Sequence, residues 1–153
     1  MSGFLHRLSG DRADIAAIHD ALYQWNCRKC GDTFDATIHA PCIDGQQAFV
    51  VCDADGGIHG GLAFHRMDGK PDCLFIDYLF LDDAARGHGN GARLMEDFLS
   101  WARANGATAV EVTSNSYQAP QFYQRMGFRI TATPPSPVPL YPDNIHYAFR
   151  REL

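Results

Sequence analysis

The apolar and polar positions of the chain predict helices and strands in alternation. Two segments carry apolar residues at intervals of three and four, so each is expected to form a helix with one apolar face. The first follows a cap at Ser9 or Asp11, and the second follows a glycine-rich loop and ends at Asn105-Gly106. A third helix is expected over residues 118–126, because Pro120 suits a first helical turn.

The remaining apolar runs predict short strands joined mainly by turns. Three consecutive runs are separated by the turn segments 53–57 and 67–71, so they are expected to form a meander. Residues 26–46 and the proline-rich residues 133–142 are expected to be irregular. No repeat or linker interrupts the pattern, which predicts a single α+β domain over residues 1–153. The expected strands cover residues 4–8, 48–52, 58–66, 72–81, 108–114, 128–131 and 145–152.

Composition narrows the class of protein. Hydrophobic residues make up 46% of the 153 positions, enough for a sizeable core. The formal net charge of −5 argues against a nucleic-acid-binding protein, which normally carries a basic face. The N-terminus lacks the apolar segment of a signal peptide, and no apolar run approaches the roughly 20 residues of a membrane span. We therefore expect a cytoplasmic protein without a membrane partner, with its five cysteines reduced.

A glycine-rich loop between an apolar strand and a helix is the strongest sign of a ligand. Its sequence, Arg86-Gly87-His88-Gly89-Asn90-Gly91-Ala92, leaves backbone N–H groups uncovered at a helix N-terminus, where a phosphate or pyrophosphate fits. No Gly-Lys-Ser/Thr follows, which excludes a Walker A loop. The spacing Gly87-x-Gly89-x-x-Ala92 also fits a dinucleotide-binding turn, with Glu111 at the expected distance. Five residues, Asp82 to Arg86, separate Leu81 from Gly87, however, whereas a dinucleotide turn follows its strand at once.

Arg86 extends the loop to a more specific pattern. Arg86-x-x-Gly89-x-Gly91 after a strand resembles the acetyl-coenzyme A signature of the GCN5-related N-acetyltransferase (GNAT) family. Residues 119–128 resemble the A-x-x-x-Y-x-x-x-G-F segment of the same family. The resemblance implies a mixed, mostly antiparallel central sheet of about six to seven strands flanked by helices.

The implied activity is transfer of an acetyl group from acetyl-CoA to a primary amine. The acceptor would be a small molecule or a peptide that attacks directly in a ternary complex, and a homodimer is common in the family. A non-catalytic acyl-CoA-binding or regulatory module on the same fold is the alternative.

The resemblance also assigns the cofactor-binding residues. The backbone of residues 79–81, at the end of the strand, would pair with the pantetheine arm. The glycine-rich loop, residues 87–92, would wrap the pyrophosphate with its N–H groups. Ser116 occupies the position at which family members often carry asparagine, beside Asn115. The expected cofactor-binding residues are Leu79, Phe80, Leu81, Arg86, Gly87, His88, Gly89, Asn90, Gly91, Ala92 and Ser116.

Acyl transfer to an amine needs a proton acceptor for the amine and a proton donor for the leaving thiolate. Tyr123 matches the family's usual proton donor. Glu111, in an otherwise apolar or small strand, is the first candidate for the base, and Asp77, inside another apolar run, competes with it. His59 and His65 alternate on one strand and are expected to be partly exposed, with a role on the substrate side left open.

Four residues invite a zinc interpretation. Cys27-x-x-Cys30 and His39-x-x-Cys42 supply the ligand types that tetrahedral zinc prefers. Their spacing does not match a standard zinc finger, and the family needs no metal. We therefore expect ordinary reduced cysteines and no metal.

Overall fold

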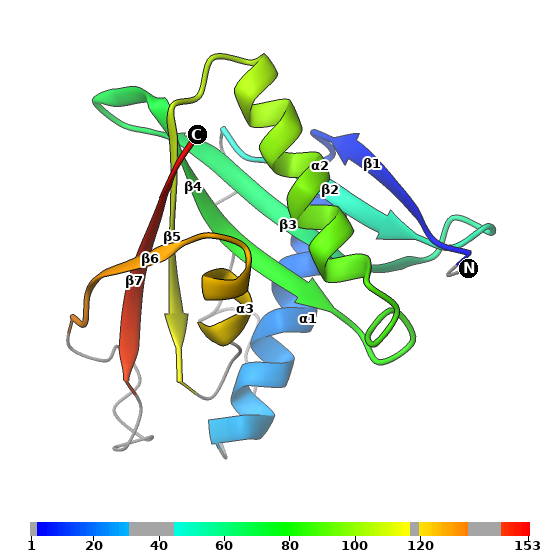
Figure 1. Cartoon of the computed structure of the whole chain (residues 1–153). Helices are drawn as coiled ribbons and strands as arrows, with labels where there is room; N and C mark the ends of the chain where they lie inside the picture. The colour runs from blue at the N-terminus through cyan, green and yellow to red at the C-terminus, as the bar shows by residue number, and fades with distance from the viewer. Residues whose placement is uncertain (1–2, 31–44, 117–119, 135–144) are drawn as a thin grey trace.

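A seven-stranded sheet forms the centre of the molecule (Figure 1). The structure is a computed structural model that describes residues 3–30, 45–116, 120–134 and 145–153. Within them, α1 (Arg12–Cys30), α2 (Asn90–Ala104) and α3 (Pro120–Arg125) accompany the sheet. The strands are β1 (Leu5–Ser9), β2 (Gln47–Cys52), β3 (Ile58–Met67), β4 (Lys70–Leu81), β5 (Ala109–Asn115), β6 (Arg129–Ala132) and β7 (His146–Glu152).

The strand order is β1-β2-β3-β4-β5-β7-β6. Only β4 and β5 are parallel neighbours, and every other adjacent pair is antiparallel. The expected mixed, mostly antiparallel sheet flanked by helices is thus confirmed, and each strand agrees with its expected range to within two residues at either end.

Helices cover both faces of the sheet (Figure 1). On one face, α2 buries Leu94 and Phe98 against the strands, and Tyr123 of α3 joins the same core. On the other face, α1 buries Ile15 and Ile18 in a smaller core. The two expected amphipathic helices therefore pack on opposite sides of one sheet.

Helix α1 is longer than expected. The prediction of irregular chain from residue 26 was wrong for residues 26–30, which continue the helix. No glycine or proline interrupts the sequence before Gly31, so nothing ends the helix earlier. Residues 31–44 and 135–144, which include most of the two segments expected to be irregular, lie outside the described residues.

Two irregularities in strand pairing place side chains that simple alternation would misplace. In the β2–β3 pair, Val51 faces Gly60 and Cys52 faces Ile58, which leaves His59 as the extra residue of a bulge. A bulge bends the strand and re-aims the side chain of its extra residue.

The second bulge lies in β4. Ala63 of β3 faces Tyr78, and Phe64 faces Ile76, so Asp77 is the extra residue. The parallel pairing of β4 with β5 ends at this point, with Ile76 opposite Val112. Beyond it the two strands separate, as the green and yellow arrows of Figure 1 show.

Candidate active site

A cavity of about 800 Å³ opens where β4 and β5 separate. Helix α1, the C-terminal part of β4, the loop before α2, β5, α3 and the start of β7 form its walls. It is lined by Leu22, Tyr23, Trp25, Asn26, Ile76, Asp77, Leu79, Phe80, Leu81, Arg86, Gly91, Val112, Thr113, Ser114, Asn115, Phe122, Tyr123, Arg125 and His146. The cavity thus brings together five of the expected cofactor-binding residues, the expected proton donor and one of the two candidate bases.

The glycine-rich loop leads directly into α2. Gly87 and Gly89 have φ angles of 77° and 75°, a left-handed conformation that glycine adopts without strain. No side chain caps the N-terminus of α2, and its first turn carries no acidic residue. The first backbone bond of the helix runs from Arg93 N to Gly89 O, so the N–H groups of residues 90–92 precede it. This end of α2 therefore has the polarity and the donors to hold an anion.

Within this loop, Gly91 lines the cavity, whereas Gly87, His88 and Gly89 are exposed beside it. Ala92 also lies outside the lining.

Arg86 fixes the loop to the end of β4. Its Nε donates to Leu81 O at 2.6 Å. Its guanidinium carbon lies 5.2 Å from the centre of the Phe80 ring and 5.6 Å from that of Trp25 on α1. Arg86 thus joins the glycine-rich loop to the helix on the other side of the cavity by cation–π contacts.

The Asn90 side chain braces the loop from within. It is buried, and its Nδ2 donates to Ala85 O at 2.9 Å. Its Oδ1 lies 3.4 Å from Nε2 of His6, whose Nδ1 lies 3.2 Å from Asp97 on α2. Any contact of Asn90 with a cofactor would therefore use its backbone N–H.

His59 clamps the start of the loop between two carboxylates. Its Nδ1 lies 2.8 Å from Asp82 Oδ2, and its Nε2 lies 2.8 Å from Asp53 Oδ2. The hydrogen bond to Asp53 is the main cause that raises the pKa of His59 above its ordinary value. Asp82 also caps the loop, because its Oδ1 accepts a hydrogen bond from Ala85 N at 3.1 Å. Only the doubly protonated imidazole can donate to both carboxylates, so the clamp is complete when His59 is charged.

Tyr123 reaches the cavity from α3. Its ring is buried and packs against Phe128 and Phe149, with ring centres 5.7 and 5.5 Å away. Burial raises the pKa of the phenol well above its ordinary value, so the hydroxyl is protonated at neutral pH. No hydrogen bond joins this hydroxyl to another group in the part of the chain that the structure describes. Tyr123 therefore lines the cavity as a protonated phenol.

Asp77 is the only acidic residue among the described residues that line the cavity. Its side chain is 14% exposed, and its Oδ2 lies 2.8 Å from Nδ1 of His65 on β3. Burial raises the pKa of this carboxyl, while hydrogen bonds to His65 and to Gln46 oppose the rise. A carboxylate whose pKa is raised in this way accepts protons more readily than an exposed one.

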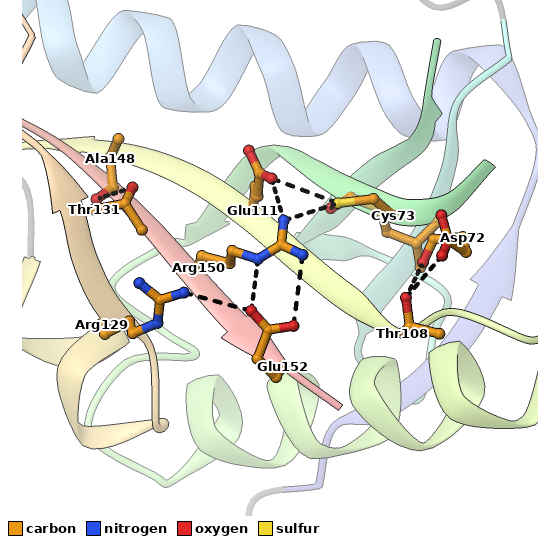
Figure 2. A network of polar contacts seen from close by, with 10 residues as sticks. Asp72, Cys73, Thr108, Glu111, Arg129, Thr131, Ala148, Arg150 and Glu152 are labelled. Carbon is orange, nitrogen blue, oxygen red and sulfur yellow. Dashed lines mark hydrogen bonds and ion pairs between the residues drawn. The ribbon is translucent and has the colours of Figure 1, made fainter. Parts of the chain in front are cut away.

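Glu111 lies outside the cavity lining, within a separate polar network (Figure 2). Its Oε2 accepts a hydrogen bond from Arg150 at 2.6 Å and lies 3.7 Å from the Cys73 sulfur. The Glu111–Arg150 pair joins β5 to β7, and within β7 Arg150 also pairs with Glu152 at 2.7 Å. The structure therefore does not place this candidate base beside Tyr123, although Val112, the next residue, lines the cavity.

Ser116 also lies outside the cavity lining. Its Oγ accepts a hydrogen bond from Ile145 N at 3.0 Å, which ties the end of β5 to the start of β7. The neighbouring Asn115 lines the cavity, and its Oδ1 lies 2.9 Å from Nδ1 of His146. A contact of Ser116 with a cofactor remains a prediction.

Sequence reasoning did not assign Trp25 or His146 to the site. Trp25 belongs to an apolar helical face, which is equally typical of a core residue. His146 carries no local signal, since only the pairing of β7 with β5 brings it to the cavity. Burial lowers the pKa of His146.

The candidate zinc ligands fall mostly outside the described residues. Cys27 is buried in α1, while the Cys30 side chain, His39 and Cys42 are not described. Within the described part of the chain, no three or more His, Cys, Asp or Glu residues gather to hold a metal ion. Nor does any described helix have the length and apolar character needed to cross a membrane.

Comparison with known proteins decides the family. Residues 14–128 match the profile described as Acetyltransferase (GNAT) family. The chain belongs to the GNAT acetyltransferase family. This GNAT acetyltransferase is 36% identical over 99 residues to a blasticidin-S acetyltransferase from Streptomyces morookaense, a match that covers 64% of this chain and 68% of that protein.

Solved structures show the same fold. A GCN5-related N-acetyltransferase from Kribbella flavida superposes with a TM-score of 0.70 at 21% identity, covering 99% of this chain and 98% of that one. An acetyltransferase of the GNAT family from Staphylococcus aureus gives a TM-score of 0.72 at 15% identity, covering 97% and 99%. The expected family is thereby confirmed.

Proposed function

We propose that this GNAT acetyltransferase moves the acetyl group of acetyl-CoA to a primary amine of a small molecule or peptide by direct attack in a ternary complex. The observation that carries the proposal is the cavity between the separating strands β4 and β5. One space there contains the exposed edge of β4, the start of α2, a protonated tyrosine and one carboxylate.

Acetyl-CoA would lie with its pantetheine arm along β4. Beyond Ile76, no described strand pairs with the edge of β4 that faces β5, so the backbone of residues 79–81 can bond to the amides of the arm. The pyrophosphate would lie at the uncapped N-terminus of α2, where residues 87–92 offer N–H groups. Arg86 would hold the loop in this arrangement through Leu81 O.

The reaction requires two protons to leave the attacking nitrogen. An ammonium group first loses one proton to a base, and the nitrogen lone pair then forms a bond to the thioester carbon while the carbonyl π electrons move to oxygen. When the carbonyl re-forms, the C–S bond breaks and its electron pair leaves on sulfur. Tyr123 would protonate that sulfur and would be reprotonated by the second proton of the nitrogen. The products are an amide, free CoA and one proton released to solvent.

Asp77 is the base that the geometry favours. It lines the same cavity as Tyr123, and burial makes its carboxylate more basic. Glu111 lies outside the lining, where its carboxylate is paired with Arg150. The two candidates make different predictions, which the pH profiles described in the Discussion separate.

The acceptor is proposed to be a cationic amine. Asp77 is the only acid among the described lining residues, and Tyr23 and Trp25 supply aromatic surface on the α1 side. A carboxylate next to aromatic rings suits an ammonium group attached to an apolar or planar body. Since one relative is named a blasticidin-S acetyltransferase, blasticidin S is the first acceptor to test.

The test is acetyl-CoA-dependent release of free thiol with a panel of amines that includes blasticidin S, polyamines, amino acids and peptide N-termini. We expect thiol release with at least one amine, together with a product heavier by one acetyl group in mass spectrometry. A reaction without amine provides the control for hydrolysis. If the protein binds acetyl-CoA and acetylates nothing, the proposal of an enzyme gives way to a non-catalytic acyl-CoA-binding module.

A further inference from the structure

We propose that His65 carries the proton of the acceptor amine from Asp77 to solvent. The inference rests on the proposed function, in which Asp77 accepts that proton. It assigns a role to a side chain that lies outside the cavity lining but touches the carboxylate that lines it.

The positions of the two side chains define a path with an inner and an outer end. Asp77 lines the cavity, and its side chain is 14% exposed. His65 does not line the cavity, and its side chain is 36% exposed. Their 2.8 Å contact joins Asp77 Oδ2 to His65 Nδ1, so the ring links the carboxylate to the surface of the sheet.

The backbone enforces this contact. His65 faces Phe75 in the β3–β4 pairing, and the bulge immediately beyond Ile76 makes Asp77 the extra residue. The aromatic ring of Phe75 lies 5.8 Å from the His65 ring and supports its orientation. The pair therefore depends on strand register and does not rely on a flexible loop.

Among the described residues, His65 is the only ionisable side chain that forms a hydrogen bond with Asp77. Gln46, just before β2, donates a neutral hydrogen bond to the carboxylate, and Tyr23 of α1 lies near enough for the Asp77 charge to raise the pKa of its phenol. Neither group accepts a proton readily at neutral pH, because an amide is not basic and the tyrosine is already protonated. An imidazole can both accept and release a proton in this range.

The proton balance follows from the proposed reaction. The ammonium group gives a proton to Asp77, which becomes a carboxylic acid. While Asp77 is ionised, Nδ1–H of His65 donates to it, so the ring must first exchange through solvent to the tautomer with its proton on Nε2. Asp77 then passes its proton to Nδ1, and Nε2 releases its proton to water. The carboxylate and the ring thereby return to their starting states, and each turnover delivers one proton to solvent. No oxidant, reductant or further reactant is required.

The alternative role for the same contact is that His65 only orients Asp77. Three variants separate the roles. His65→Gln retains an amide that can donate to Asp77 but cannot relay a proton, whereas His65→Ala removes both abilities and leaves space for free imidazole. Asp77→Asn removes the carboxylate, so in this variant added imidazole has no carboxylic acid from which to accept a proton.

The measurement is kcat for acetyl transfer, with the KM for acetyl-CoA determined alongside it. We expect both His65 variants to lower kcat about 10-fold or more with little change in the KM for acetyl-CoA. Added imidazole should restore His65→Ala in proportion to its concentration, and should leave the wild type and Asp77→Asn unchanged. Circular dichroism and thermal melting verify that each variant is folded.

Three results would overturn the relay. They are an unchanged kcat in His65→Ala, full activity in His65→Gln, or a loss in His65→Ala that imidazole does not restore. Each of these would occur in a protein whose wild type still acetylates an amine. Failure of the wild type to acetylate any amine would instead reject the proposed function itself.

Discussion

At the scale of single residues, Asp77 and His59 share one structural origin. Each is the extra residue of a β-bulge, and each ends in close polar contacts that a regular strand would not make. Bulges re-aim side chains and are frequent beside active sites. Asp77 lines the cavity from such a position, and His59 holds the loop that leads to it.

Tyr123→Phe is expected to lower kcat about 100-fold, because it removes the proton for the leaving sulfur. The phenylalanine ring retains the packing against Phe128 and Phe149, so the melting temperature should not fall. Steady-state kinetics with thermal melting provides the measurement. Tyr147→Phe is the matched control, since Tyr147 packs against the same core outside the cavity lining and should retain full activity. A Tyr123→Phe enzyme with wild-type kcat would exclude the donor role.

Asp77→Asn and Glu111→Gln test the identity of the base through pH dependence. The base must be ionised, so the wild-type kcat/KM should fall as pH drops through the pKa of Asp77. Burial sets that pKa above the ordinary carboxyl value, so the fall begins at a higher pH than for an exposed aspartate. Asp77→Asn should have a kcat/KM about 100-fold lower and should no longer show this fall at low pH. Glu111→Gln should retain the wild-type kcat/KM and the same fall at low pH. The opposite pattern would assign the base to Glu111.

At the scale of secondary-structure elements, the glycine-rich loop is a short segment held at several points. His59 and Asp82 hold its start, Arg86 bonds to the end of β4, and Asn90 braces its interior. These contacts leave the N-terminus of α2 open for an anion while they limit the motion of the loop. Ordering the loop before binding reduces the entropy lost when the cofactor binds.

His59→Gln is expected to weaken acetyl-CoA binding, because glutamine cannot donate a charged hydrogen bond to both Asp53 and Asp82. The folded-state pKa of His59 is raised, so its contribution to stability is full below its ordinary value of about 6.5 and is lost as pH rises through the raised value. The pKa of Asp53 is lowered, so its carboxylate stays ionised and keeps its hydrogen bond to charged His59 until the pH falls toward that lowered pKa. Thermal melting and calorimetric titration of acetyl-CoA at several pH values provide the measurement.

Below neutral pH the variant should melt about 2–4 °C lower than the wild type, and the difference should shrink in alkaline solution. A constant difference across the pH range would show that the charge of His59 plays no part in the clamp.

Gly61→Ala is expected to destabilise the packing of α1 on the sheet. A Cβ at this position would lie 2.4 Å from Phe49 O and 2.7 Å from Ile18 Cδ1, so the backbone or α1 must shift. The free energy of unfolding should fall by about 1–3 kcal/mol in denaturant titration. Gly10→Ala is the control, because a Cβ there meets nothing within 4 Å and its φ is not positive. Equal stability of the two variants would contradict this account of α1 packing.

At the scale of the whole molecule, the sheet combines the four strands β1 to β4 with the three strands β5, β7 and β6 around one parallel contact. The network of Glu111, Arg150 and Glu152 joins β5 to β7 on one side of that contact, as Figure 2 shows. The cavity lies at the other end, where β4 and β5 no longer pair. The same parallel pair therefore both unites the two parts of the sheet and ends at the mouth of the cavity.

Much of this arrangement could be predicted from the sequence, because it depends on local patterns. Periodicity located two helices, Pro120 indicated the third, and apolar runs between turns located the seven strands. The spacing of Arg86, Gly89 and Tyr123 indicated the family. The bulge at Asp77 could not be predicted, since an extra residue in a strand leaves no mark on an apolar run. The sequence therefore favoured Glu111 over Asp77 as the base, whereas the register of β4 placed only Asp77 among the lining residues.

Calorimetric titration of acetyl-CoA tests most directly whether the space between β4 and β5 holds the acyl donor. Gly91 lines that space at the start of α2, and a Cβ there has room, with its nearest contact 3.4 Å away on Phe122. Gly91→Leu should therefore fold while its longer side chain occupies the cavity. We expect one acetyl-CoA to bind per wild-type chain, and binding to the variant to be at least about tenfold weaker. Absence of binding to the wild type, or equal affinity in the two proteins, would contradict the account.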